Sequence, residues 1–157
     1  MKKYIITAVL SVFTALSVSA QAKKNTQVSL LYQDYIAIKS ALASDDAEKA
    51  SKAASQFIKS SSDIKGNIIS EKELTTLKED AKTIAASKNI SAQRKSFHRL
   101  SDHMIAVAKE FKVSQNPVYV QYCPMAEASW LSDESKIINP YYGKSMLSCG
   151  NVKSTIK

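Results

Sequence analysis

The stretch from Val28 to Leu42, VSLLYQDYIAIKSAL, decides the fold class because its apolar residues recur at steps of three and four. That spacing gathers them on one face of an α-helix, whereas a half-buried strand would alternate at every second residue. The apolar face consists of Val28, Leu31, Tyr35, Ile38 and Leu42. The pattern therefore predicts a helix that ends at Ser44-Asp45-Asp46, where an aspartate can cap the helix that follows.

Three further segments repeat this pattern between short polar breaks. Ser70 with Glu73 three residues later is typical of a capping box at a helix start, and another helix is expected to begin near Ser91. Their apolar residues are Ala47, Ala50, Ala54 and Phe57, then Leu74, Leu77, Ala81 and Ile84, then Phe97, Leu100, Met104, Val107 and Phe111. The pattern predicts a mainly α protein, an antiparallel four-helix bundle; three helices with an irregular first segment is the alternative.

The chain from Pro117 onward follows a different pattern. Residues 118–122, VYVQY, are β-prone and predict a short strand or an extended segment lying across the bundle. The same part of the chain contains both cysteines, the only tryptophan and all three prolines. We therefore expect an irregular C-terminal segment with a short strand and a Cys/Met loop, with residues 117–150 as its motif region.

The N-terminal residues have the pattern of a secretory signal peptide, with Lys2 and Lys3 before an uncharged run and small residues up to Ala20. We expect residues 1–20 to be removed, 21–27 to form a disordered linker and 28–157 to form one helical-bundle domain. No later run approaches the roughly 20 apolar residues of a membrane-spanning helix. The expected product is periplasmic or secreted, without stable membrane insertion after cleavage.

The charge is basic, at +8 for the whole chain, but the lysines are scattered singly among acidic residues. This distribution is typical of a solvated surface, and no groove of alternating aromatic and basic residues suggests nucleic acid as a partner. The sequence also lacks a Gly-x-Ser-x-Gly nucleophile elbow, a phosphate-binding glycine loop and a Cys-x-x-Cys-His haem motif. We expect a protein that is not an enzyme.

Two short motifs near the C-terminus could bind a metal. Cys123-Pro124-Met125 and Met146-Leu147-Ser148-Cys149 each offer one thiol and one thioether. Both are soft ligands, which suit copper(I), and silver(I) equally, better than any hard cation. If the intervening loop closes, Cys123, Met125, Met146 and Cys149 would form a low-coordinate site, with Trp130, Tyr141 and Tyr142 as walls that limit the access of water.

A disulfide between the same cysteines is the alternative. Two cysteines in an exported protein most often pair, and closing a loop of about 27 residues would stabilise the fold by about 3.5 kcal/mol. The protein would then be a structural or protein-interaction module held by a Cys123–Cys149 bridge. The two states could also alternate with redox conditions.

Two histidines, His98 and His103, lie five residues apart on the fourth predicted helix. At about 100° per residue they point some 140° apart, so one site cannot easily use both. Each is either a surface histidine or, if the C-terminal segment folds back over this helix, an additional metal ligand.

The C-terminal stretches VYVQYCPMA (118–126), WLS (130–132), INPYYG (138–143) and MLSCG (146–150) resemble the uncharacterised secreted bacterial domain of the DUF3347 type. The resemblance extends from about Ser29 to Ile156. That domain also occurs appended to periplasmic adaptor proteins of copper and silver efflux pumps. The resemblance thus implies metal sequestration or handover to an efflux system, with such an adaptor or another envelope protein as the partner. The role would be carried by Cys123, Met125, Met146 and Cys149.

Overall fold

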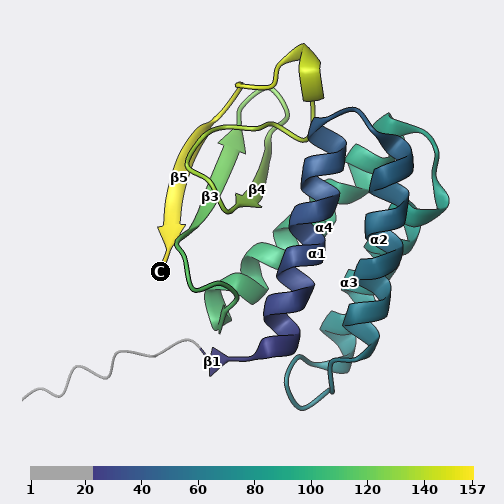
Figure 1. The fold of residues 1–157 in the computed structure, drawn as a ribbon, viewed down its shortest axis with the longest axis vertical. Coiled ribbons are helices and arrows are strands. Elements are labelled where there is room, and N and C mark those ends of the chain that lie inside the picture. The colour runs from purple at the N-terminus through teal and green to yellow at the C-terminus, as the bar shows by residue number, and fades with distance from the viewer. Residues whose placement is uncertain (1–22) are drawn as a thin grey trace, which may run out of the picture.

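The computed structural model describes residues 23–157, so the predicted signal peptide, residues 1–20, lies outside the described residues. The described chain is mainly helical, with four helices followed by a small sheet (Figure 1). The helices are α1 (Thr26–Ala43), α2 (Ala47–Ser62), α3 (Glu71–Ala86) and α4 (Ile90–Glu110). All four predicted helices are confirmed.

Each helix begins at a side chain that accepts hydrogen bonds from otherwise unpaired backbone N–H groups, as expected of N-cap residues. The side-chain carbonyl oxygen of Asn25 accepts from two such groups at the start of α1, and the side chains of Asp46, Ser70 and Asn89 accept from one each at the starts of α2, α3 and α4. Helix α1 starts at Thr26, inside the range 21–27 for which we expected a linker. Just before it, β1 (Lys23–Lys24) pairs in parallel with β2 (Phe111–Lys112).

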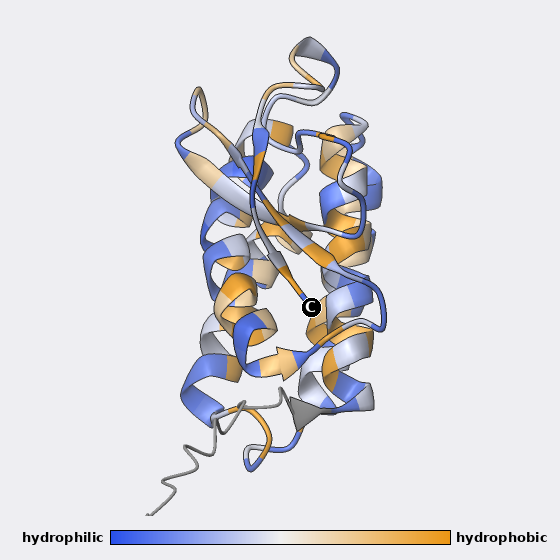
Figure 2. Ribbon diagram, turned by 90° about the vertical axis from the view of Figure 1, so that its left-hand side faces the viewer, coloured by the Kyte–Doolittle hydropathy of each residue, from blue (hydrophilic) through white to orange (hydrophobic). Residues whose placement is uncertain are grey.

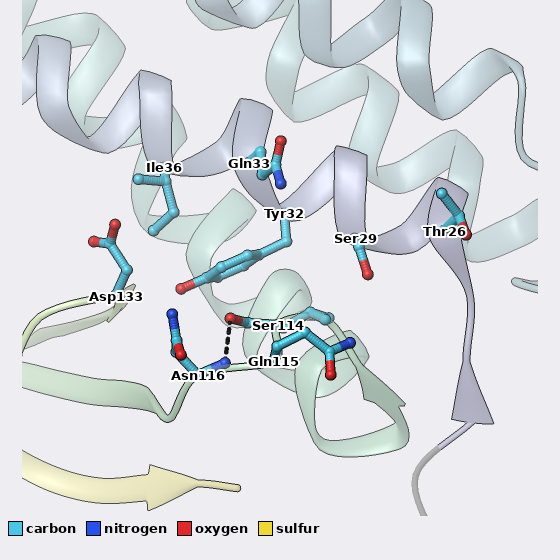
Figure 3. Close-up of a pocket in the computed structure, with 10 residues that line it drawn as sticks. Thr26, Ser29, Tyr32, Gln33, Ile36, Ser114, Gln115, Asn116 and Asp133 are labelled. Atoms are coloured by element: carbon cyan, nitrogen blue, oxygen red, sulfur yellow. Dashed lines mark hydrogen bonds between the residues drawn. The ribbon is translucent and has the colours of Figure 1, made fainter.

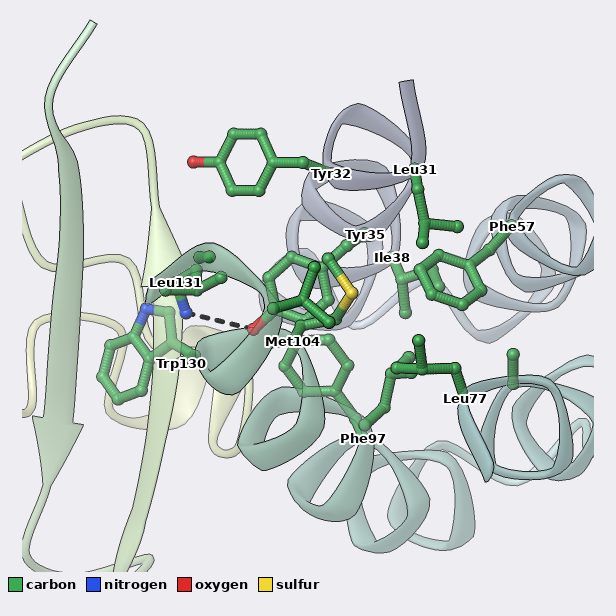
Figure 4. Close-up of a cluster of buried hydrophobic side chains, with 14 of the residues drawn as sticks. Leu31, Tyr32, Tyr35, Ile38, Phe57, Leu77, Phe97, Met104, Trp130 and Leu131 are labelled. Carbon is green, nitrogen blue, oxygen red and sulfur yellow. Dashed lines mark hydrogen bonds between the residues drawn. The ribbon is translucent and has the colours of Figure 1, made fainter. Parts of the chain in front are cut away.

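Successive helices pack against one another, and α1 also contacts α4. The helices alternate hydrophobic and hydrophilic residues along their length, and the apolar faces meet in one core (Figures 2 and 4). Every residue of the predicted apolar face of α1 is fully buried. The predicted apolar faces of α3 and α4 are almost completely buried. The small residues Ala50 and Ala54 of α2 are also fully buried, so periodicity predicted the helical part of the core well.

The C-terminal part corrects the sequence prediction, because it forms a sheet where only one short strand in an irregular segment was expected. The predicted strand is β3 (Val118–Cys123), and it is joined by β4 (Ala128–Ser132) and β5 (Asn151–Ile156). The sheet is antiparallel in the order β4-β3-β5. The remaining segment contains only a short 3-10 turn, η1 (Gly143–Ser145).

The sheet is attached to the helices through β4, which packs against α4. The hydroxyl of Tyr35 on α1 accepts a hydrogen bond from the Leu131 backbone N–H at 3.1 Å and bonds to the Ser101 hydroxyl of α4 at 2.8 Å (Figure 4). One buried tyrosine thus joins α1, α4 and the sheet. None of the helices in the described part of the chain is long and apolar enough to cross a membrane.

Candidate functional site

The two cysteines meet at one end of the sheet. Cys123 is the last residue of β3, and the pairing of Tyr122 with Asn151 brings the start of β5, and with it Cys149, beside that end. The two sulfur atoms are 2.9 Å apart, and both cysteines are free. Cys123 is fully buried and Cys149 half-buried. The structure therefore brings together two of the predicted ligands that are 26 residues apart along the chain.

Asn139 holds the loop that carries Cys149. This fully buried side chain donates from its amide to the Cys149 carbonyl at 2.8 Å, and its own carbonyl oxygen accepts from the Tyr141 N–H at 2.8 Å. The Asn139 backbone N–H also donates to the Leu147 carbonyl at 2.8 Å. Sequence reasoning did not single out Asn139, although an Asn before Pro140 is a common signal for this kind of side-chain turn.

The pKa values of the two thiols shift in opposite directions. Burial acts to raise the pKa of Cys123, but the hydrogen bonds to its sulfur outweigh this and lower the pKa below its ordinary value. Those bonds come first from the Cys149 thiol, then from the Ala126 N–H, the Asn139 amide and the Met125 N–H. The pKa of Cys149 is raised, first because its thiol donates to Cys123 and then by burial and the neighbouring charge. The pair therefore favours a thiolate at Cys123 that accepts a hydrogen bond from a Cys149 thiol.

Aromatic side chains lie beneath and beside the pair. Trp130 is fully buried, and the edge of its ring packs against Tyr141 at 5.9 Å between centroids. The Tyr142 hydroxyl donates to the Met125 carbonyl at 2.9 Å and so ties the segment before η1 to the first predicted motif. A surface pocket of about 440 Å³ opens beside Cys149 and is lined by Tyr122, Pro124, Cys149, Gly150 and Asn151.

The two predicted methionine ligands lie close to the cysteines along the backbone but at the surface. Met125 lies in the turn after Cys123 and is 63% exposed. Met146 is 36% exposed, and its carbonyl accepts from the Cys149 N–H at 3.0 Å. Both residues therefore adjoin the cysteines along the chain and are exposed to solvent.

The two histidines have other neighbours. His103 Nδ1 lies 3.1 Å from the Asp80 carboxylate of α3, which also accepts from Arg99 Nε at 2.7 Å. His98 lies 3.8 Å from Asp102 and against the edge of the Tyr141 ring. Within residues 23–157, no cluster of three or more His, Cys, Asp or Glu side chains could hold a metal ion. That statement does not cover methionine, whose thioether can also bind a soft metal ion.

A second feature that the sequence did not predict is a polar pocket at the start of α1, lined by ten residues from three separate segments (Figure 3). No local pattern could have indicated it, because Tyr32 belongs to α1, Asn116 to the connection before β3 and Asp133 to the residues after β4.

The comparisons with known proteins give one match. The model of the family described as a protein of unknown function, DUF3347, matches residues 31–116. This range contains most of α1, all of α2 to α4 and the start of the connection to β3, and it ends before Cys123. No curated protein and no solved structure matched the chain. The match therefore covers the helical part and not the cysteine pair.

Proposed function

The chain belongs to the DUF3347 family, whose function is not known, and on that premise we propose that it is an exported protein that binds a soft metal ion, copper(I) or silver(I), through Cys123 and Cys149. The observation that carries the proposal is the pair of free sulfurs 2.9 Å apart, and the pKa of the Cys123 thiol is lowered below its ordinary value. Thiolates are the ligands that copper(I) prefers. The proposed role is therefore metal binding.

Metal binding requires the two sulfurs to separate. A linear two-coordinate ion with bonds near the 2.3 Å of metal–thiolate bonds places its sulfurs about 4.6 Å apart. Cys123 is fixed at the end of β3, so Cys149 is the residue that moves. Cys149 is half-buried, precedes Gly150 and borders the pocket of about 440 Å³, which gives its side chain room to rotate.

Met125 and Met146 complete the proposed Cys/Met loop as weaker ligands at its rim. Their exposed thioethers would meet an incoming ion first and pass it to the thiolates. Thioethers bind without losing a proton, so they exchange an ion faster than thiolates do. This arrangement suits sequestration or transfer to an efflux system, for example to a periplasmic adaptor protein. The corresponding localisation is the periplasm or the exterior.

The second candidate function is a protein-interaction module stabilised by a Cys123–Cys149 disulfide. It is favoured by the same short distance, because the sulfurs need to approach by less than one ångström to bond. In this case Tyr141 and Tyr142, which are half-buried, would belong to a partner-binding face, whereas Trp130 is fully buried. The two functions differ in the state of the thiols during use and in whether the methionines matter.

Native mass spectrometry of the reduced chain, residues 21–157, with added Cu(I) tests the proposal. We expect one copper per chain, lost in Cys123→Ser and Cys149→Ser and weakened in Met125→Leu and Met146→Leu. His103→Gln is the matched control, because this ring bonds to Asp80, and His98→Gln is a second control. Failure of the reduced protein to take up copper would exclude the metal site, and a protein purified from the periplasm as a stable disulfide would then favour the interaction module.

A further inference from the structure

The pocket at the start of α1 lies apart from the cysteine pair. It has a volume of about 450 Å³, within the roughly 300–1,000 Å³ of small-molecule sites. One wall is α1, the second is the connection from Val113 to Asn116, and Asp133 closes the third side (Figure 3). Three segments far apart in sequence thus converge on one cavity.

The Tyr32 hydroxyl is the central observation. Tyr32 is 96% buried by area, since only 4% of it is exposed, and its hydroxyl has no hydrogen-bond partner among the described residues. In Figure 3 the ring crosses the pocket and the hydroxyl points between Asp133 and Asn116. A buried hydroxyl without a partner destabilises the protein unless water or a ligand satisfies it. The oxygen itself is closed off from solvent, so a ligand group that satisfies it has to enter between the Asp133 and Asn116 side chains.

The next turn of α1 provides a contrast. Tyr35 is also fully buried, but its hydroxyl is satisfied by Ser101 and by the Leu131 N–H. Helix α1 thus carries two buried tyrosines three residues apart, one with a complete set of partners inside the protein and one with none. The Tyr35 hydroxyl therefore has a structural role, whereas the Tyr32 hydroxyl still lacks a hydrogen-bond partner.

The remaining lining indicates the chemistry of the ligand. Seven of the ten lining residues carry a hydroxyl or amide group, which both donates and accepts hydrogen bonds, while apolar atoms make up the larger part of the lining surface. The polar members besides Tyr32 are Thr26, Ser29, Gln33, Ser114, Gln115 and Asn116. Asp133 is the one charged residue among the ten that line the pocket, and neither Lys nor Arg contributes. The face of the Tyr32 ring and Ile36 supply an apolar wall.

We propose that this pocket binds a neutral polyhydroxylated molecule of the size of a mono- or disaccharide. Each hydroxyl of such a ligand donates and accepts, which matches the amides and hydroxyls of the lining, and vicinal hydroxyls pair well with a carboxylate such as Asp133. The C–H face of a sugar ring packs on an aromatic ring, here that of Tyr32. Anionic ligands are disfavoured because no cation lines the pocket and Asp133 would repel them.

The test is a titration of the isotope-labelled chain, residues 21–157, followed by NMR, with glucose, N-acetylglucosamine and cellobiose as probes at millimolar concentrations. Binding in the pocket shifts the amide signals of residues 29–36 and 113–116. Tyr32→Phe is expected to weaken binding about tenfold or more, the effect of one lost ligand hydrogen bond, without lowering the Tm of the free protein. Gln33→Ala, an exposed helix position, is expected to weaken binding as well.

Tyr35→Phe is the matched control, because it removes a satisfied hydroxyl: it should lower the Tm and leave the affinity unchanged. The proposal is overturned if none of the three sugars shifts these signals, or if Tyr32→Phe lowers the Tm as Tyr35→Phe does without affecting affinity. Putrescine tests the competing ligand class. If putrescine binds instead of the sugars, and Asp133→Asn abolishes its binding, the pocket is a site for organic cations and the proposal is wrong.

Discussion

Asn139 and Cys149 are joined by a hydrogen bond of 2.8 Å from the buried Asn139 amide to the Cys149 carbonyl. This bond, together with the one from Asn139 to the Cys123 sulfur, connects the loop before η1 to both thiols. One uncharged side chain therefore positions one cysteine and acidifies the other.

Replacing this side chain, Asn139→Ala, should destabilise the protein by about 2 kcal/mol, because three backbone groups and a sulfur lose their partner in a buried site. Urea denaturation under reducing conditions measures this. The control is Asn67→Ala, an exposed position between α2 and α3, which should change stability by less than about 0.5 kcal/mol. Equal effects of the two substitutions would contradict the role of Asn139.

The thiol pair should ionise in two separated steps. Thiolate absorbance near 240 nm, followed against pH in the reduced protein, should rise once below and once above the ordinary pKa of 9.0, since the two groups share a proton. In Cys149→Ser the hydroxyl still donates to Cys123, so only the lower step should remain. In Cys123→Ser the single step should move back toward the ordinary value. A single step of two protons at that value in the unmodified protein would rule out the coupled pair.

Gly150 has a positive φ of 135°, and a Cβ placed there would lie 2.7 Å from the Tyr122 carbonyl oxygen and 3.1 Å from the Trp130 ring. Gly150→Ala should therefore cost about 2 kcal/mol or more, because both the backbone conformation and the contact are unfavourable. Thermal unfolding checks the cost, and Trp130 fluorescence reports whether the ring shifts. Gly66→Ala is the matched control: its Cβ would meet only the flexible Glu71 side chain, which can move away, so a similar loss there would refute this explanation.

The turn between α1 and α2 should make stability depend on acid pH. The pKa of Asp45 is lowered below 3.8, first by its hydrogen bond with Arg94 and then by the Lys144 N–H. Because the folded pKa is lower than the unfolded one, this contribution is complete above the unfolded value and is lost as the pH falls through the folded value. The free energy of unfolding should fall as the pH drops below about 4, and less steeply in Asp45→Asn. Identical pH profiles of the two proteins would contradict the prediction.

Asn is the appropriate substitution because Asp45 has a φ of 61°, which Asn tolerates better than most residues. The companion variant Arg94→Met should lower stability at every pH, because the Arg94 guanidinium also donates to the Leu42 and Pro140 carbonyls at 2.8 Å each. These bonds tie the end of α1 to the segment that leads to the cysteine loop.

The helices could be predicted because their signals are local. A stripe such as that of Val28 to Leu42 needs only neighbouring residues to be read, and a cap such as Ser70 acts within one turn. The strand at residues 118–122 was found for the same reason. Strand β5 was missed because NVKSTI is almost entirely exposed at a sheet edge and has no apolar alternation.

The amino-acid sequence by itself determined that the protein is mainly helical and which residues fill the helical core. It also determined which two cysteines and two methionines offer soft ligands. Only the tertiary structure decided that Cys123 and Cys149 lie 2.9 Å apart, that His103 bonds to Asp80, and that the Tyr32 hydroxyl is left without a partner. The physical reason is the range of the interactions. Helix periodicity and capping act over a few residues, whereas the site and the pocket depend on strand pairing and on packing between segments that the sequence separates by dozens of residues.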